Sequence, residues 1–403
     1  MKKQITIMGN VWDFWPILKM FDRLYESRFI SFYKPWLKGE IERSKILLFR
    51  EKVKSPLVWP FKLVIRTFKI IRTIKSFKPN LVITHHDEAN ISILPVIFLN
   101  KIFRFSKQTK FFLWIRNNPI ERYKNGLYAR FMLFTYKYLY PLADYIIVQT
   151  KMGKKIIERN FPLLRNKVIV FPNVYDIKRN IELSKEKIEK KYKKIFSSGF
   201  VFINIGRLDE QKGQWFLIRA FKKVVESYPD AKLVIIGKGA LKNKLYDLSV
   251  RLNINDKVFL LGMQPNPFKF LVRSHCLVFP SLFEGMPNVV IEALSLNIPV
   301  ISTDCKTGPR EILCPDLEVN EKIQYPYYGE YGILTKPFPR KFIWDDLKER
   351  PLIEEEKMLA NLMIEMIKDK NLRRRYSNGI KRAKDFDIEK IIKEWEKLMI
   401  KLK

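Results

Sequence analysis

Short apolar runs alternate with longer amphipathic segments along the whole chain. The runs of the first half are rich in Ile, Val, Leu and Phe and cover residues 4–8, 81–84, 111–115, 145–149 and 168–171. Those of the second half cover residues 201–205, 233–236, 258–261, 277–279 and 300–302. Near-continuous apolar runs that alternate with helices are typical of parallel strands covered on both faces.

Two such sets of strands predict an α/β fold with two Rossmann-like domains in tandem. The segment 178–197 is charged, helix-prone and mixed in sign, and we predict that it links a domain over 1–177 to a domain over 198–384. Residues 385–403 are expected to hold a last helix, with apolar positions such as Ile391, Trp395 and Leu398 at helical spacing. In such sheets ligands bind beyond the carboxyl ends of the strands, so chemistry is expected just after each strand.

No stretch of the sequence predicts a membrane span. The most apolar stretch, 91–99, is about half as long as a spanning helix requires, and it contains Pro95. The N-terminus has two lysines, a short apolar run over 5–8 and then Gly9-Asn10, which indicates a first strand and its turn, whereas a signal peptide needs a longer apolar core. We therefore expect a cytoplasmic protein.

Composition narrows the class of protein. The 403 residues are 47% apolar, which is enough to fill two cores and excludes a disordered chain. Three cysteines cannot build a disulfide framework and lack zinc-ligand spacing, so a reducing compartment is expected. Only three histidines are present, which argues against a His-based metal site, and we predict no metal.

The charge is strongly positive and uneven. The formal net charge is +34, and residues 1–180 hold 35 Lys and Arg against 12 Asp and Glu. Three interpretations of this excess positive charge are open: the protein binds nucleic acid, it binds an anionic membrane surface, or the charge reflects a bias in composition and serves no partner.

The loop after the strand at 201–205 carries two cations. Arg207 and Lys212 leave the strand end and enter the next helix within the segment 206–213. A guanidinium fork and a nearby ammonium match the charge of a diphosphate. The alternative is a solvated charged loop.

The loop after the strand at 277–279 leads into a helix through Gly285 and Pro287. Free N–H groups of the first helical turn can hold an anion there. Glu284 precedes the helix and Glu292 lies inside it, and carboxylates in this place suit the hydroxyls of a sugar and a ribose. The alternative for Glu292 is an ordinary surface position.

These motifs together resemble the retaining glycosyltransferases of family 4, which have the GT-B fold. The resemblance rests on 206–213, on the pair Glu284 and Glu292, and on the segments 266–267, 275–281, 297–304, 308–313 and 331–334. It covers about residues 198–335. It implies two Rossmann-like domains with parallel sheets that face a central cleft, an acceptor side first, a donor side second, and a last helix that packs back toward the first domain.

The resemblance also implies a reaction and a set of roles. Such enzymes transfer a sugar from a nucleotide donor, here expected to be a uridine diphosphate sugar, with retention and without a metal or other cofactor. Arg207 and Lys212 would neutralise the donor diphosphate, Glu284 would bind sugar hydroxyls, and Glu292 would bind the ribose. The remaining donor-side positions are expected along the nucleotide: Gly237, Gly262, Met263, Gly285, Met286, Asn288 and Val289. No Asp-x-Asp metal motif stands in a suitable place, and cations can stabilise the leaving diphosphate instead.

The first half resembles the family less closely. Its first turn, with Gly9 and Asn10, lacks the paired glycines that many members have there, but Asn10 and, further along, Asn117 are still expected on the acceptor side. His85, His86 and Asp87 follow a strand and resemble an acceptor-side segment, although a buried, hydrogen-bonded histidine pair is the alternative. After the next strand, Arg116 stands where many members have a histidine, followed by Asn117, and it would serve either the donor phosphate or a lipid phosphate of the acceptor.

Two segments of the first half carry much of the excess positive charge. The segment 57–78 has six cations and no acid, and further cations follow at Lys101, Arg104, Lys107 and Lys110. A basic amphipathic helix can lie on an anionic bilayer, each nearby cation contributing roughly 1 kcal/mol. The alternative is a sheet-covering helix with a solvated edge. Nucleic acid is not expected, because no recognised binding module is present.

A lipid-linked acceptor joins these observations. We therefore predict hexosyl or N-acetylhexosaminyl transfer to a glycan or polyprenyl-diphosphate-linked acceptor, at the inner face of the cytoplasmic membrane, in the assembly of surface polysaccharide, lipopolysaccharide or lipid-linked oligosaccharide. Two alternatives remain: a sugar-nucleotide epimerase or hydrolase on the same fold, and a non-catalytic basic protein that binds membrane surfaces.

Overall fold

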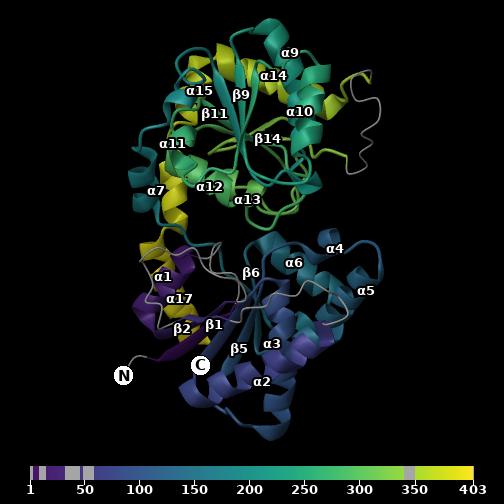
Figure 1. Cartoon of the computed structure of the whole chain (residues 1–403), viewed down its shortest axis with the longest axis vertical. Helices are drawn as coiled ribbons and strands as arrows, with labels where there is room; N and C mark the ends of the chain where they lie inside the picture. The colour runs from purple at the N-terminus through teal and green to yellow at the C-terminus, as the bar shows by residue number, and fades with distance from the viewer. Residues whose placement is uncertain (1–2, 9–14, 32–45, 49–58, 340–349, 403) are drawn as a thin grey trace. The chain divides into compact units, whose positions relative to one another are not determined.

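The computed structural model describes residues 3–8, 15–31, 46–48, 59–339 and 350–402. The chain forms two compact units (Figure 1). The first unit contains residues 1–175 and the returning segment 391–403, and the second contains residues 176–390. Each unit is built on one sheet.

The first unit has a seven-stranded sheet in the order β3-β2-β1-β4-β5-β6-β7. All of its pairings are parallel. The strands are β1 (Gln4–Met8), β2 (Glu26–Ser31), β3 (Ile46–Leu48), β4 (Leu81–His85), β5 (Lys110–Ile115), β6 (Tyr145–Val148) and β7 (Val168–Val170). Each predicted run of this half corresponds to one strand. The strands β2 and β3 were not predicted, because β2 contains four polar residues in ESRFIS and β3 is only three residues long.

Two helical layers cover this sheet. The helices are α1 (Trp15–Leu24), α2 (Trp59–Phe77), α3 (Asp87–Phe103), α4 (Pro119–Arg122), α5 (Leu127–Phe134), α6 (Lys151–Asn160) and α17 (Ile388–Lys401), with the short turns η4 (Thr135–Leu139), η5 (Tyr140–Leu142) and η6 (Pro162–Leu164). The chain steps from β1 to β2 in one direction and from β4 to β7 in the other. Right-handed crossovers therefore put α1 on one side of the sheet and α2, α3, α5 and α6 on the opposite side. Figure 1 shows this division, with α1 and α17 together on one side.

The strand β5 shows how the two layers share the sheet. Phe111, Leu113 and Ile115 belong to one hydrophobic cluster with buried side chains of α2, α3, α5 and α6. The alternate residue Phe112 contacts the ring of Trp395 on α17, with ring centroids 6.4 Å apart. The period-two alternation of a strand thus serves both layers.

The last helix, α17, completes the second layer of the first unit. Trp395 is fully buried, packs edge-on against Phe21 and Phe171, and its indole nitrogen donates a hydrogen bond to the hydroxyl of Tyr25 at 2.9 Å. In addition, Lys110 Nζ donates to the carbonyl of Leu402 at 2.5 Å. The end of the chain is therefore part of the core formed by its beginning.

The second unit has a seven-stranded sheet in the order β10-β9-β8-β11-β12-β14-β13. The strands are β8 (Val201–Ile205), β9 (Lys232–Ile236), β10 (Val258–Gly262), β11 (Cys276–Phe279), β12 (Val300–Thr303), β13 (Tyr327–Tyr328) and β14 (Ile333–Thr335). Among the described strands of this sheet, the short β13 runs antiparallel, against β14, and the other pairings are parallel. The five runs predicted for this half correspond to β8 to β12, whereas β13 and β14 are too short to give a pattern.

Helices cover both faces of the second sheet. They are α7 (Ile177–Ser184), α8 (Lys190–Lys193), α9 (Gln214–Ser227), α10 (Lys242–Arg251), α11 (Phe268–Leu271), α12 (Asn288–Ser295), α13 (Pro309–Leu313), α14 (Glu354–Lys368), α15 (Lys370–Arg375) and α16 (Ile380–Ala383), with the turns η7 (Glu210–Lys212) and η8 (Lys384–Phe386). A buried ion pair joins α9 to α14, since Arg219 Nε donates to Glu356 Oε1 at 2.7 Å.

The segment 178–197 was predicted to be a linker between the domains. In the structure it is instead a folded part of the second unit. It forms α7 and α8, and Asn266 Nδ2 donates to the carbonyl of Leu183 at 2.8 Å while Lys269 pairs with Glu189 at 3.0 Å. The boundary between the units lies at residues 175 and 176. Charge of mixed sign indicates an exposed helix face, but it does not reveal which core the other face covers.

Two parallel-sheet α/β units confirm the predicted fold class. Among the described residues, no helix combines the length and the apolar character needed to cross a membrane.

Candidate functional site

The loop after β8 brings two cations to the carboxyl end of the second sheet. Arg207 follows the strand directly and has an exposed side chain, which pairs with Asp209 at 3.0 Å. Lys212 ends the turn η7, and its side chain lies against Gly206, where a Cβ atom would meet it at about the ordinary contact distance of 3.5 Å. The two cations thus differ: one is exposed, and the other is held within the protein.

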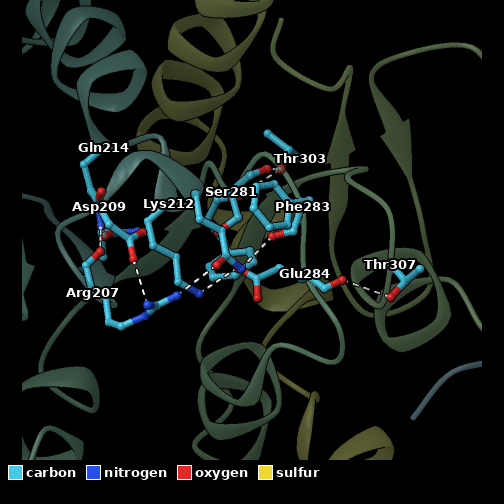
Figure 2. Close-up of polar contacts among 12 residues, drawn as sticks. Arg207, Asp209, Lys212, Gln214, Ser281, Phe283, Glu284, Thr303 and Thr307 are labelled. Carbon is cyan, nitrogen blue, oxygen red and sulfur yellow. Dashed lines mark hydrogen bonds and ion pairs between the residues drawn. The ribbon is translucent and has the colours of Figure 1, made fainter. Parts of the chain in front are cut away.

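Lys212 forms the central contact of this loop. Its Nζ donates to Glu284 Oε1 at 2.6 Å, and both side chains are largely buried (Figure 2). The ammonium also lies 5.4 Å from the centre of the Phe279 ring. A charge pair this deep in the protein is strong only when both partners are held in place. The structure therefore brings together two predicted site residues that lie far apart in the sequence.

The backbone on either side of Glu284 is fixed by its neighbours. Glu284 N–H donates to the carbonyl of Lys306 at 3.0 Å, and Thr307 N–H donates to the carbonyl of Glu284 at 3.1 Å. The hydroxyl of Thr307 donates to the carbonyl of Gly285 at 2.7 Å. The carboxylate is consequently presented by a rigid loop.

Two glutamines that were not predicted as site residues hold these loops: Gln211 ties the loop after β8 to the loop that carries Glu284, and Gln214 fixes the loop after β8. Gln211 accepts a hydrogen bond from Arg207 Nη2 at 2.9 Å and donates from its Nε2 to the carbonyl of Phe283 at 2.8 Å. Gln214 Nε2 donates to the carbonyl of Arg207 at 2.9 Å. Figure 2 shows Gln214 beside Arg207, and Phe283 next to Glu284. Both glutamines lie in or beside the segment 206–213, and their position just after a strand end was the available signal.

Glycines end the neighbouring strands β9 and β10. At Gly237, a Cβ atom would stand 1.8 Å from the carbonyl oxygen of Gly206, so this position accepts only glycine without a shift of the loop. Gly262 has φ +71° and open space where a Cβ would lie. Met263 follows it and is 63% exposed. The backbone at this edge is thus closely packed at Gly237 and open at Gly262.

The helix α12 begins directly after the loop that carries Glu284. Gly285 and Met286 lie in the loop, Pro287 is the N-cap residue, and Asn288 and Val289 form the first turn. The N-cap supplies no side-chain hydrogen bond to this turn. The N-terminus of α12 therefore stands next to the Lys212–Glu284 pair, with its dipole favouring negative charge there.

Glu292 lies one turn further along α12. Its side chain is half-buried, and burial raises the pKa of its carboxyl to about 7. No hydrogen bond or ion pair engages this carboxyl within the described part of the chain.

In the first unit, His85 and His86 stand where β4 ends and α3 begins. His85 is fully buried, and burial together with the positive charge of Arg116 holds its pKa well below the usual range, so the imidazole is neutral. The two rings lie 4.7 Å apart. Only His85 of this pair is buried, whereas His86 is half-buried and has φ +70°.

Asp87 opens α3 and organises a polar cluster that was not predicted. Its carboxylate accepts hydrogen bonds from the hydroxyls of Tyr123 and Tyr136, the latter at 3.1 Å, and pairs with Arg122 at 3.4 Å. Burial and this carboxylate raise the pKa of Tyr136 well above its usual value. Tyr136 comes from η4 in the middle of a helical stretch, and no local sequence signal marks it.

The end of the next strand, β5, places Arg116 and Asn117 beside this cluster. Arg116 is close enough to His85 to lower its pKa. The amide oxygen of Asn117, oriented toward Arg122, accepts from Arg122 Nη1 at 2.9 Å. The structure thus groups His85, His86, Asp87, Arg116 and Asn117 at the ends of two adjacent strands, while Asn10 lies outside the described residues.

Within the ranges that the structure describes, no three His, Cys, Asp or Glu side chains are grouped so that they could hold a metal ion. The three cysteines, Cys276, Cys305 and Cys314, are free and buried.

Comparisons with known proteins agree with one another. Residues 184–319 match the family model described as "Glycosyl transferases group 1". The chain is 67% identical over 398 residues to an uncharacterized glycosyltransferase of Methanocaldococcus jannaschii, covering 99% of this chain and 98% of that protein.

A second relative has a described activity. It is the N-acetylgalactosamine-N,N'-diacetylbacillosaminyl-diphospho-undecaprenol 4-alpha-N-acetylgalactosaminyltransferase of Campylobacter jejuni, which is 31% identical over 73% of this chain and 71% of its own length. Among solved structures, Anabaena HepE in complex with UDP and glucose superposes with a TM-score of 0.73 at 16% identity, covering 99% of this chain and 100% of HepE. This likeness identifies the fold as GT-B.

Proposed function

The chain belongs to the group 1 glycosyltransferases, and from this premise we propose that it moves a hexose or N-acetylhexosamine from a uridine diphosphate sugar to a glycan or polyprenyl-diphosphate-linked acceptor. We further propose that the anomeric configuration is retained, as in family 4, and that no metal takes part. The single observation that carries this proposal is the buried pair of Lys212 and Glu284 beside Arg207.

The cations suit the leaving group. When the bond between the sugar and the diphosphate breaks, negative charge grows on the diphosphate, and fixed cations in a site with little water stabilise it. Lys212 is fixed by Glu284 and by the loop, so it supplies charge without reorganisation. Arg207 is exposed and paired with Asp209, and it would exchange this partner for the diphosphate as the donor enters. The N-terminus of α12, with Gly285, Met286, Asn288 and Val289, offers further N–H groups to the phosphate or the sugar.

The carboxylates suit the neutral parts of the donor. Glu284 keeps one oxygen on Lys212, and its other oxygen can accept from hydroxyl groups of the sugar. Glu292 follows Glu284 in the sequence and lies inside α12. Its carboxyl has no partner in the described chain, and it could therefore accept a hydrogen bond from a ribose hydroxyl. HepE was solved with UDP and glucose, which supports uridine as the base, with Gly237, Gly262 and Met263 lining its approach.

The acceptor is assigned to the first unit. The relative from Campylobacter jejuni acts on a sugar that is linked to diphospho-undecaprenol, which supports a lipid-linked acceptor for this chain. Asp87 and Asn117 offer oxygen and nitrogen atoms for sugar hydroxyls, and Arg116 offers a cation for an acceptor phosphate. We place the reaction at the inner face of the cytoplasmic membrane, in surface polysaccharide, lipopolysaccharide or lipid-linked oligosaccharide assembly.

The test has three parts. Thermal shifts against a panel of nucleotide sugars identify the donor, because a ligand that binds only the folded state raises its stability. Transfer is then assayed with that donor and polyprenyl-diphosphate-linked sugars, with and without a chelator, and the product linkage is assigned by NMR. An α-linkage from an α-linked donor and full activity with chelator support the proposal.

Other outcomes favour the alternatives. Release of free sugar or an epimerised nucleotide sugar without an acceptor would indicate a hydrolase or epimerase on the same fold. Absence of a shift with every nucleotide sugar would indicate a binding protein without catalysis.

A further inference from the structure

Large apolar side chains are exposed on one region of the first unit. Among the described residues, most of the exposed large apolar side chains fall between positions 61 and 138, with Phe61 73%, Phe68 68% and Leu127 83% exposed. Scattered exposed apolar residues are normal, but a concentration on neighbouring elements marks an interaction surface.

The helix α2 contributes a continuous outer stripe. Its inner side is fixed to α3, because Arg66 is buried and donates to Ser92 at 3.0 Å and to Glu88 at 2.8 Å. The stripe on the opposite side begins with Phe61, Ile65 and Phe68 at spacings of four and three residues, which places them on one face. The same stripe continues with the exposed cations Arg72 and Lys75.

The segment α5 and η4 repeats this arrangement. Ala129, Met132 and Tyr136 face the core, whereas Leu127, Phe131 and Phe134 are exposed. An ordinary surface helix has one apolar face, which it buries. Here both faces are apolar, so the outer face is adapted to a second apolar environment.

The helices share one side of the sheet. The buried sides of α2, α3 and α5 belong to a single hydrophobic cluster, and Figure 1 shows the three helices on the side opposite to α1 and α17. Near its C-terminal end, α3 adds Phe98 and Ile102, which are 51% and 55% exposed. We call the outward side chains of α2, α3, α5 and η4 the apolar–basic face.

The charge of this region is one-sided. Residues 59–142 contain fifteen Lys and Arg but only three Asp and Glu. Each of these acids is already engaged: Glu88 pairs with Arg66, Asp87 with Arg122, and Glu121 with Lys124. The surface around the apolar anchors is therefore strongly positive.

We propose that the apolar–basic face inserts into an anionic lipid bilayer. The exposed aromatic and aliphatic side chains would enter the boundary between headgroups and acyl chains, while the surrounding lysines and arginines would contact the lipid phosphates. A bilayer is the occupant that matches both features at once, since it offers a flat apolar layer under a continuous layer of negative charge. This inference extends the proposed function, because a lipid-linked acceptor is confined to such a surface.

The first experiment measures sedimentation of the full chain with vesicles of phosphatidylglycerol and phosphatidylcholine, and with vesicles of phosphatidylcholine alone. We expect binding to the anionic vesicles only. The double variants Phe61→Ser with Phe68→Ser, and Leu127→Ser with Phe131→Ser, should each bind at least about tenfold more weakly. The matched control is Ile400→Ser on α17, whose side chain is 67% exposed on the opposite side of the sheet and whose loss should change nothing.

A second measurement reports insertion itself. The native cysteines are buried, so Phe131→Cys and Ile400→Cys can each be labelled with an environment-sensitive fluorophore. The label at 131 should become brighter and blue-shifted on anionic vesicles, and the label at 400 should not. Failure of the wild-type chain to sediment, or variants that bind as well as the wild type, would overturn the inference.

One further outcome also decides against it. A wild-type dimer that becomes monomeric in the serine variants, without a vesicle effect, would assign the face to a second copy of the chain. Vesicle binding is measured without a sugar donor, and sugar transfer can be measured with an acceptor that carries a short, soluble lipid. Failure of vesicle binding would therefore refute the membrane inference alone, and failure of transfer would refute the proposed function alone.

Discussion

At the scale of single residues, the pair of Lys212 and Glu284 is the feature on which the donor site depends. The two residues are 72 positions apart and meet at 2.6 Å with little access to water. An ammonium and a carboxylate held at this depth must each satisfy the other, so a change at either one leaves a buried charge without its partner.

We therefore expect Lys212→Met and Glu284→Gln each to lower the rate of sugar transfer by about 10²–10³-fold, the range typical for loss of one group that stabilises developing charge. Steady-state kinetics with the donor identified above provide the measurement. Glu210→Gln is the control, because Glu210 lies in the same turn with an exposed side chain. A normal rate in both variants at a normal melting temperature would remove the pair from the site.

Glu292 predicts a pH dependence of stability. A glutamate in the unfolded chain ionises near pH 4.5, whereas burial raises the pKa of Glu292 to about 7 in the folded protein. Between these values the folded state holds a proton that the unfolded state releases, so the contribution of this group to stability falls as the pH rises through this window.

Glu292→Gln should therefore stabilise the protein at pH 8 and have a smaller effect at pH 5. Urea unfolding of both proteins at the two pH values measures the difference. An equal effect at both values would contradict the raised pKa.

At the scale of elements, the strand ends β8 and β9 are packed so closely that their loops form one surface. Gly237 allows the loop after β9 to pass beside the carbonyl of Gly206, next to Arg207. Gly262 ends β10 in a left-handed conformation with space beside it. Glycine is required at the two positions for different physical reasons: close packing at Gly237 and a left-handed backbone at Gly262. Replacing each glycine with alanine should therefore have different effects.

Gly237→Ala should lower the transfer rate by about 10²-fold, because its Cβ would displace the loop that carries Arg207 and Lys212 by the order of an ångström. Gly262→Ala should cost about 1–2 kcal/mol of stability through its positive φ, with a smaller effect on the donor affinity. Denaturant unfolding and donor titration of both variants provide the comparison. The reverse order of effects on transfer would refute this account of the loop.

At the scale of the whole molecule, the chain builds one core, builds a second core and then returns to the first. Ile391–Lys403 belongs to the first unit, and Trp395 lies against residues from α1, β5 and the segment after β7. The first unit is therefore complete only after the second has been synthesised.

Trp395→Ala should destabilise the first unit by about 3–5 kcal/mol, because it removes a large buried ring and its hydrogen bond to Tyr25. Hydrogen exchange followed by mass spectrometry should show faster exchange in β1, β5 and α1 and little change in the second sheet. Ile400→Ala, on the exposed side of the same helix, is the control. Uniform loss of protection in both units would show that they unfold together.

The sequence by itself determined the class of fold and the central part of the donor site. Buried parallel strands are apolar on both faces, so ten of them were visible as short runs, whereas β2, β3, β13 and β14 were not, because they are short or partly polar. Arg207, Lys212 and Glu284 stand in loops that follow strands, where a parallel sheet places its ligands, and the resemblance to family 4 implied their roles. The tertiary structure then showed that Lys212 and Glu284 are in contact.

Only the tertiary structure decided which distant residues complete these loops and which faces stay exposed. Tyr136 reaches Asp87 from 49 positions away, and local spacing carries no trace of such a contact. Likewise, the charged segment 178–197 reads as a connector, yet α7 and α8 cover the second unit. An apolar stripe on α2 is the same in sequence whether it faces a core or solvent, and the packing of Arg66 against α3 fixed Phe61 and Phe68 on the outside.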